Sequence, residues 1–247
     1  MSNDFSSVTE LGGEPVSSGQ IDRFAQRYYW AGEFCRGKDV LEVACGAGQG
    51  LGYLASLCRS LRAGDITRSL VDQARSHYGS RIEIAEMDAE HLPLEAESLD
   101  VVILFEAIYY LPSAERFVEE CRRVLRPGGL LLLATANCDL FDFNPSPFSV
   151  RYYSVPELGA MLSSYGFDSR FFGGSPVNSQ GIKSRALRLA KKAAVTFNLI
   201  PGSMSGKRWL KRLVFGKLVP MPKELRARDV RYTPPNAVDG SRPDTIH

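Results

Sequence analysis

The stretch VLEVACGAGQGLGYLA, from Val40 to Ala55, joins an apolar run to three glycines at every second position. The run has the length of a buried strand, and the glycines and LGYLA that follow it are typical of a turn into a helix. Such a strand–turn–helix unit brings backbone amides to a ligand at the carboxyl end of a parallel sheet. One residue of the run, Glu42, is a carboxylate in an otherwise apolar strand, so it indicates what lies against the loop.

The spacing of the glycines argues against a dinucleotide. Dinucleotide-binding turns follow the pattern G-x-G-x-x-G, in which the third glycine lets the helix pack closely while the pyrophosphate rests on its amides. Gly46 and Gly48 fit the first two positions, but Leu51 stands where the third glycine is expected. Glu42 would also repel a pyrophosphate and attract an ammonium or sulfonium group. The loop therefore predicts a ligand that carries positive charge.

Strand-length apolar runs alternate with helix-period segments through the first 175 residues, which is typical of an α/β protein with a parallel sheet. The expected strands cover residues 39–44, 60–65, 81–86, 99–105 and 130–136. The expected helices cover residues 69–78, 113–126 and 154–165, with Ser113 and Ser154 as caps of the last two.

Composition sets the class of protein. The chain has 247 residues, of which 44% are hydrophobic and 23% charged, so it can bury a sizeable core. It shows neither a signal-peptide pattern nor an uncharged apolar run of membrane-spanning length. The five cysteines form no close pair, and no Cys or His pair has zinc spacing. We expect a cytoplasmic protein without a metal site.

Charge is distributed unevenly along the chain. Residues 1–175 carry 15 Lys and Arg against 24 Asp and Glu, whereas residues 176–231 carry 14 against 2. Residues 182–202 and 206–222 have the pattern of basic amphipathic helices. This basic region predicts contact with a phosphate, a nucleic acid or an anionic membrane, and a solvated charged face is the plain alternative.

Taken together, several segments in order resemble the class I S-adenosylmethionine-dependent methyltransferases. They are E-x-A-C-G-x-G-x-G (Glu42 to Gly50), AGDI (63–66), the stretch 87–111, LRPGGLLLLATAN (125–137) and YYSVPELGAMLSSYGF (152–167). The resemblance covers residues 20–173. It implies a Rossmann-like doubly wound, mostly parallel sheet and S-adenosyl-L-methionine as cofactor. Residues 1–175 would form the cofactor-binding core, and residues 176–247 a basic, largely helical extension that contributes to the acceptor site. This fold usually ends in an antiparallel strand pair, and the last of these strands is expected to be absent or displaced.

The resemblance also assigns roles to single residues. Glu42 and the loop that follows it would hold the methionine part of the cofactor, Asp65 the ribose, and Asp88 the adenine amino group; Phe105 and Glu106 would border the reacting methyl. The full cofactor set is Glu42, Ala44, Gly46, Gly48, Asp65, Ile66, Asp88, Ala89, Phe105 and Glu106. Tyr109, Tyr152 and Tyr153 would line the substrate pocket or pack in the core. Relatives often carry a histidine where this chain has Tyr110, so no catalytic residue is assigned, and His91 is expected to be a partly exposed structural residue.

Three functions follow as hypotheses. The first is methyl transfer to an oxygen or nitrogen of a small molecule, such as a sugar on a phosphate-bearing carrier, as in surface-glycan and secondary-metabolite pathways. The second is methylation of a quinone or lipid ring at the membrane surface, with peripheral contact to anionic lipid. The third is a non-catalytic regulatory subunit that binds the cofactor. No nucleic-acid partner is expected, and the sequence leaves the oligomeric state open.

Overall fold

The structure is a computed structural model, and it describes residues 4–140, 143–174 and 218–238. Its elements in chain order are β1 (Pro15–Ser17), α1 (Ser18–Cys35), β2 (Asp39–Val43), α2 (Leu51–Ala55), β3 (Ser60–Asp65), α3 (Arg68–Tyr78), η1 (Gly79–Arg81), β4 (Glu83–Glu86), β5 (Leu99–Phe105), η2 (Ile108–Tyr110), α4 (Ala114–Val124), β6 (Leu125–Ala134), α5 (Val155–Ser164), β7 (Phe172–Gly173), β8 (Leu218–Pro220) and β9 (Asn236–Ala237). The five strands and three helices predicted from the sequence are all present, with ends shifted by at most two residues except in β6, which begins at Leu125, five residues before the predicted start.

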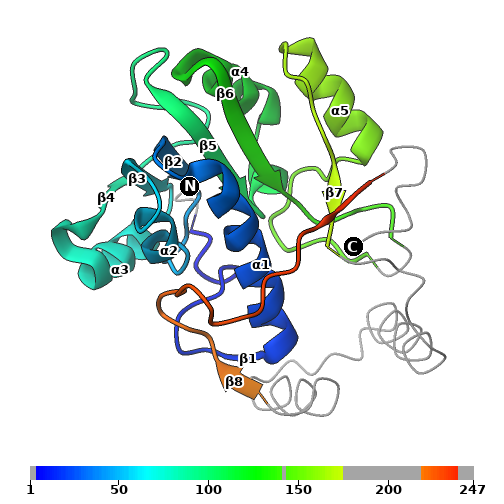
Figure 1. Ribbon diagram of the computed structural model, residues 1–247. Helices are drawn as coiled ribbons and strands as arrows, with labels where there is room; N and C mark the ends of the chain where they lie inside the picture. The colour runs from blue at the N-terminus through cyan, green and yellow to red at the C-terminus, as the bar shows by residue number, and fades with distance from the viewer. Residues whose placement is uncertain (1–3, 141–142, 175–217, 239–247) are drawn as a thin grey trace.

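The central sheet has the strand order β4-β3-β2-β5-β6, and every neighbouring pair in it is parallel (Figure 1). The chain moves outward from β2 to β4 on one side and then returns to place β5 on the other side of β2. This reversal creates a crevice at the carboxyl ends of β2 and β5, which is where open α/β sheets bind ligands. The parallel α/β fold predicted from the alternation is confirmed.

The side chains of the central strands alternate between the two faces of the sheet. Val40, Val101 and Ile103 pack with α1 on one face, whereas the residues that follow them in sequence pack with α4 and α5 on the other. Glu42 is two residues after Val40, so alternation directs its carboxylate toward α1. The position of this charge therefore follows from the pleat of β2.

The segment 218–238 returns to the core. Its strand β8 pairs with β1, and Met221 and Leu225 are buried in the cluster under α1. Glu224 accepts from His77 and Arg81, and the Leu225 amide donates to the Gln49 carbonyl at 2.7 Å. These contacts join part of the predicted extension to the core, close to the glycine loop.

Of the basic helices expected at 182–202 and 206–222, residues 182–202 and 206–217 lie outside the described residues. The helix prediction is wrong for the end of the second stretch, because Leu218–Pro220 forms strand β8 and pairs with β1. The strand pair β7 and β9 forms a separate antiparallel sheet, so within the described part of the chain β6 is the edge of the main sheet. In the same residues, no helix combines the length and apolar character needed to cross a membrane.

Candidate cofactor and acceptor site

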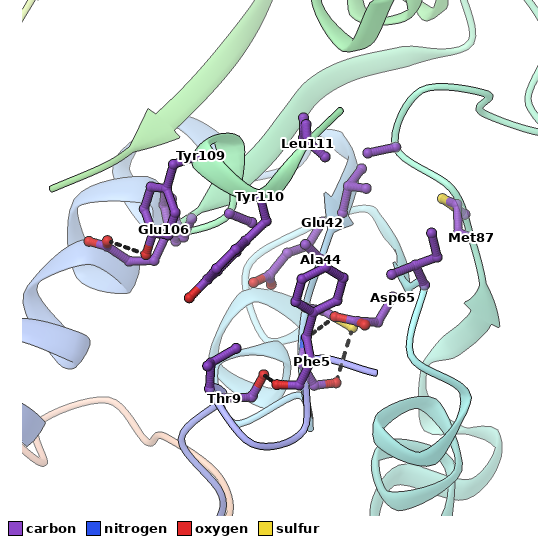
Figure 2. A pocket seen from close by; sticks show the side chains of 18 of the residues that line it. Phe5, Thr9, Glu42, Ala44, Asp65, Met87, Glu106, Tyr109, Tyr110 and Leu111 are labelled. Atoms are coloured by element: carbon purple, nitrogen blue, oxygen red, sulfur yellow. Dashed lines mark hydrogen bonds between the residues drawn. The ribbon is translucent and has the colours of Figure 1, made fainter. Parts of the chain in front are cut away.

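A cavity of about 490 Å³ lies at the carboxyl ends of the central strands (Figure 2). Three carboxylates line it: Glu42 near the end of β2, Asp65 at the end of β3, and Asp88 shortly after β4. Of the ten residues predicted to bind the cofactor, all but Gly48 line this cavity. The ends of separate strands thus bring together residues that are far apart in the sequence.

Glu42 is the most deeply buried of these carboxylates, with 1% of its surface exposed. The Tyr28 hydroxyl of α1 donates to Glu42 Oε1 at 2.5 Å, while Oε2 has no hydrogen-bond partner among the described residues. Burial raises the pKa of Glu42 to about 8, against the opposing effects of the Tyr28 hydrogen bond and the nearby Arg27 charge. A cationic ligand in the cavity would stabilise this carboxylate, which gives a physical reason for the charge in the strand.

The loop after β2 is shaped by residues with positive φ. Ala44 has φ 54° and Gly46 has φ 58°, so the chain turns sharply as it leaves the strand. Asp65 fixes this turn, because its two carboxylate oxygens accept from the Gly46 amide at 2.9 Å and the Thr67 amide at 2.8 Å. Asp65 therefore organises the loop as well as lining the cavity.

The other two glycines of the motif serve packing. A Cβ at Gly48 would lie 3.0 to 3.2 Å from Leu51, Ala74 and Tyr78, and its carbonyl accepts from the Tyr78 hydroxyl. A Cβ at Gly50 would lie 1.9 Å from the Tyr28 ring. Gly48, predicted to bind the cofactor, does not line the cavity; this part of the loop packs against Ala74 and Tyr78 of α3.

The residues predicted near the adenine lie at the more open side of the cavity. Ile66 is 37% exposed, and Asp88 is bound locally by the Glu90 amide and by His91 at 2.9 Å. His91 itself is largely exposed. It takes part in a surface pair with Asp88, as expected for a structural histidine.

A second charged cluster lies at the end of β5. Glu106, with φ 52°, accepts from Arg27 at 2.8 Å and from the Tyr109 hydroxyl at 3.2 Å. Burial and the Glu106 charge both raise the pKa of Tyr109 above its usual value, so it remains a proton donor. The cluster holds one carboxylate in a fixed position at the cavity wall.

The tyrosines differ in position. Tyr109 and Tyr110 line the cavity, whereas Tyr152 stacks behind Tyr109 with ring centroids 4.3 Å apart. Tyr153 is buried in the cluster that includes Leu158 and Leu162. Only the first of the three predicted substrate tyrosines thus reaches the cavity, and Tyr152 acts through its contact with that ring.

Sequence reasoning missed the residues that α1 and the N-terminal segment bring to the cavity. Phe5, Thr9 and Glu10 line it, and Phe5 packs on Tyr110 at 5.1 Å (Figure 2). Arg27 and Tyr28 reach it from α1. The helical spacing of apolar residues in the sequence of α1 could have predicted this helix. Nothing in that spacing, however, distinguishes Arg27 from a surface residue or Tyr28 from a core residue.

Comparison with known proteins identifies this region. Residues 41–133 match the family model described as a methyltransferase domain. A probable S-adenosylmethionine-dependent methyltransferase of Mycobacterium tuberculosis is 39% identical over 137 residues, which cover 54% of this chain and 50% of the relative. A phthiotriol/phenolphthiotriol dimycocerosates methyltransferase of Mycobacterium ulcerans is 43% identical over 102 residues, covering 39% of this chain and 36% of the relative. The chain spans about half the length, or less, of these curated relatives.

Solved structures support the fold. The [4+2]-cyclase SpnF superposes with a TM-score of 0.56 over 84% of this chain and 80% of its own, at 17% identity. A possible histamine N-methyltransferase of Thermotoga maritima gives a TM-score of 0.52 over 61% of this chain and 75% of its own, at 22% identity. At these identities the likeness concerns architecture alone, and the cyclase shows that one fold serves different reactions.

Proposed function

We propose that the chain is a class I S-adenosylmethionine-dependent methyltransferase that transfers a methyl group to an oxygen or nitrogen of a small molecule, as its similarity to the methyltransferase domain model and to the mycobacterial relative supports. One observation carries the proposal. Carboxyl groups from the ends of three adjacent parallel strands line one cavity, and one oxygen of Glu42, Oε2, is buried there without a hydrogen-bond partner among the described residues. Buried carboxyl groups are stabilised by a partner of opposite charge or by hydrogen-bond donors, so such a site favours a ligand that carries both.

The residues present fit this cofactor. Glu42 would face its positive charge, the Ala44–Gly46 turn would approach its methionine part, and Asp65 would accept from the ribose. Asp88, Ala89 and Ile66 would surround the adenine. When bound, S-adenosylmethionine supplies a methyl group on a positively charged sulfur. The protein then has to hold an acceptor atom in line and exclude water.

Glu106 is our candidate for the residue that takes the proton of the acceptor. It lines the cavity, and Arg27 and Tyr109 fix its carboxylate from two sides. As the acceptor oxygen or nitrogen bonds to the methyl group, its proton would pass to Glu106. The relatives from M. ulcerans and M. tuberculosis are named for phthiotriol and phenolphthiotriol dimycocerosates, names with the ending of a hydroxyl compound, which favours a hydroxyl acceptor.

The cavity favours an apolar acceptor over a phosphate-bearing one. Its acceptor side is formed by aromatic rings, among them Phe5, Tyr109 and Tyr110. Among the described residues that line it, Arg27 is the one basic side chain, and that charge is already paired with Glu106. We therefore favour a hydroxyl on a lipid or ring compound, the second of the hypotheses drawn from the sequence.

The proposal is tested by incubating the protein with labelled S-adenosylmethionine and detergent-dispersed lipid extract, and measuring demethylated cofactor and labelled product. Glu106→Gln should lower kcat by about 10²- to 10⁴-fold while changing cofactor affinity little, because the loss concerns proton transfer. Glu119→Gln, on the exposed side of α4, is the matched control and should behave as the parent.

Two outcomes would contradict these roles. A folded Glu106→Gln variant with full turnover would remove Glu106 from the chemistry. Tight cofactor binding without turnover on lipid extract or on aqueous extract would favour a non-methylating role of the fold, such as the regulatory subunit.

A further inference from the structure

The segment that follows β6 contains a tight turn with an aromatic residue at an unfavourable position. The Ser149 amide donates to the Ser146 carbonyl at 3.2 Å, Pro147 is the second residue, and Phe148, with φ 67°, is the third. Proline followed by a residue of positive φ is the pattern of a type II turn, in which glycine or asparagine is preferred at the third position. Phenylalanine is therefore strained there.

The strained residue is also exposed. Phe148 has 65% of its surface accessible and Val150 has 60%, the two highest values among the large hydrophobic residues that the structure describes. The positive φ of Phe148 and the exposure of both apolar side chains to water each cost the protein stability when nothing is bound to it. Residues 143–150 carry no charged side chain, so the tip of the turn is apolar and uncharged.

The turn is attached directly to the acceptor side of the cavity. Ser146 Oγ hydrogen-bonds to the Tyr110 hydroxyl at 2.5 Å, and the Ser146 amide donates to the Tyr152 hydroxyl at 3.0 Å. The Val150 amide donates to the Tyr109 carbonyl at 2.7 Å. Whatever binds the tip is thereby placed beside the two tyrosines that line the cavity.

We propose that Phe148 and Val150 insert into a lipid surface, so that the cavity opens toward an acceptor held in that surface. Two side chains are too small for a stable protein interface, which needs roughly 1,000 Å² of buried area, whereas a lipid interface accepts single aromatic and aliphatic side chains. Continuity with the aromatic side of the cavity connects the tip to the acceptor. The inference rests on the proposed function in one respect, the apolar acceptor.

The test is co-flotation of the full chain with phosphatidylcholine vesicles, without cofactor or acceptor. The parent should float. Phe148→Asn should lower the partition constant of the protein between vesicles and water by about tenfold or more, because one aromatic side chain is no longer buried in the lipid. Because asparagine accepts positive φ, the same variant should melt at the same temperature as the parent or higher. Raising the salt concentration should change little, since the tip is uncharged.

Leu130→Thr is the matched control, because Leu130 is 41% exposed on the edge strand β6 and threonine suits a strand. It should float like the parent. Failure of the parent to float, or equal flotation of Phe148→Asn, would overturn the inference. A self-association seen by sedimentation and lost in Phe148→Asn, without flotation, would assign the tip to a contact between copies and also overturn it.

These outcomes are separate from those of the proposed function. Flotation of a parent that shows no turnover would contradict the methyltransferase activity and leave the lipid contact standing. Turnover on detergent-dispersed extract by a parent that does not float would support the methyltransferase activity and contradict the lipid contact.

Discussion

Glu42 stands at a strand position that faces the packed helix α1, where an apolar side chain would give the more stable protein. Its carboxylate is buried, receives one hydrogen bond from Tyr28, and has a pKa of about 8. The folded protein thus holds a proton on Glu42 that the unfolded chain releases at a pH near 4.5. Stability falls as the pH rises from about 4.5 to about 8, because ionisation is then favoured only in the unfolded state.

We therefore expect Glu42→Gln to raise stability at alkaline pH. At pH 8.5 the variant should be more stable than the parent by about 2 to 4 kcal/mol, the scale of a shift of several pKa units, and near pH 5 the difference should almost vanish. Its affinity for S-adenosylmethionine should fall, because glutamine cannot release a proton and present a negative charge to the cationic ligand. Thermal melts across pH and calorimetric titration measure both effects. A variant that is less stable than the parent at pH 8.5 would show that the carboxylate is not destabilising.

At the scale of elements, the glycine loop and α1 depend on each other. Tyr28 lies where a side chain at Gly50 would be, and it contacts Glu42 and the Phe105 ring from that position. The close approach of a ring from another helix explains a glycine that the ligand does not require. The loop therefore takes its shape partly from α1.

Gly50→Ala tests this dependence. The added methyl would overlap the buried Tyr28 ring, so we expect a loss of about 2 to 4 kcal/mol in the free energy of unfolding, as for overpacking against a side chain with no room to move. Ala47→Gly, in the same loop, is the control for altered loop flexibility. Urea unfolding measures the difference. A Gly50→Ala variant as stable as the parent would mean that Tyr28 moves aside at little cost.

The sequence predicted the main elements because each strand and helix carries its own periodicity and stop signals. The continuous apolar run of β5 and the Ser154 cap of α5, which forms a capping box with Glu157, are such local signals. It was also predictable that Asp65 and Glu42 lie at the same end of the sheet, because the carboxyl ends of parallel strands meet at one edge. Arg27 and Phe5 were not, because their place depends on how α1 and the N-terminal segment pack on the sheet, which no local pattern records.

At the scale of the whole molecule, the two ends of the sheet have different tasks. The carboxyl ends form the cavity, and the amino ends carry a network of ion pairs. In this network Asp39 and Asp100, on β2 and β5, are bound by Arg59 and Arg126 at 2.5 to 3.2 Å. Hydrogen bonds, chiefly from Arg59 to Asp39 and from the Asp39 amide to Asp100, hold the pKa values of both carboxyl groups below their usual range.

This separation predicts that the network affects stability without affecting ligand binding. Asp100→Asn should lower the free energy of unfolding by about 1 to 2 kcal/mol at pH 7, the scale of charged hydrogen bonds at a partly exposed site. Because the folded pKa of Asp100 is depressed, its contribution is present above the unfolded value of 3.8 and is lost as the pH falls through the folded value. The difference between variant and parent should therefore shrink on acidification below about pH 4.

The matched control is Asp72→Asn on α3, whose side chain is 61% exposed and 4.0 Å from Arg68, and which should change stability little. Denaturant unfolding at several pH values and calorimetric titration with S-adenosylmethionine provide the two readouts. Asp100→Asn should leave cofactor affinity unchanged, since Asp100 is the second residue of β5, and the cavity lies at the other end of that strand, beside Phe105. An affinity that falls along with stability would mean that the sheet transmits changes from its amino ends to the site, and that the two ends are coupled.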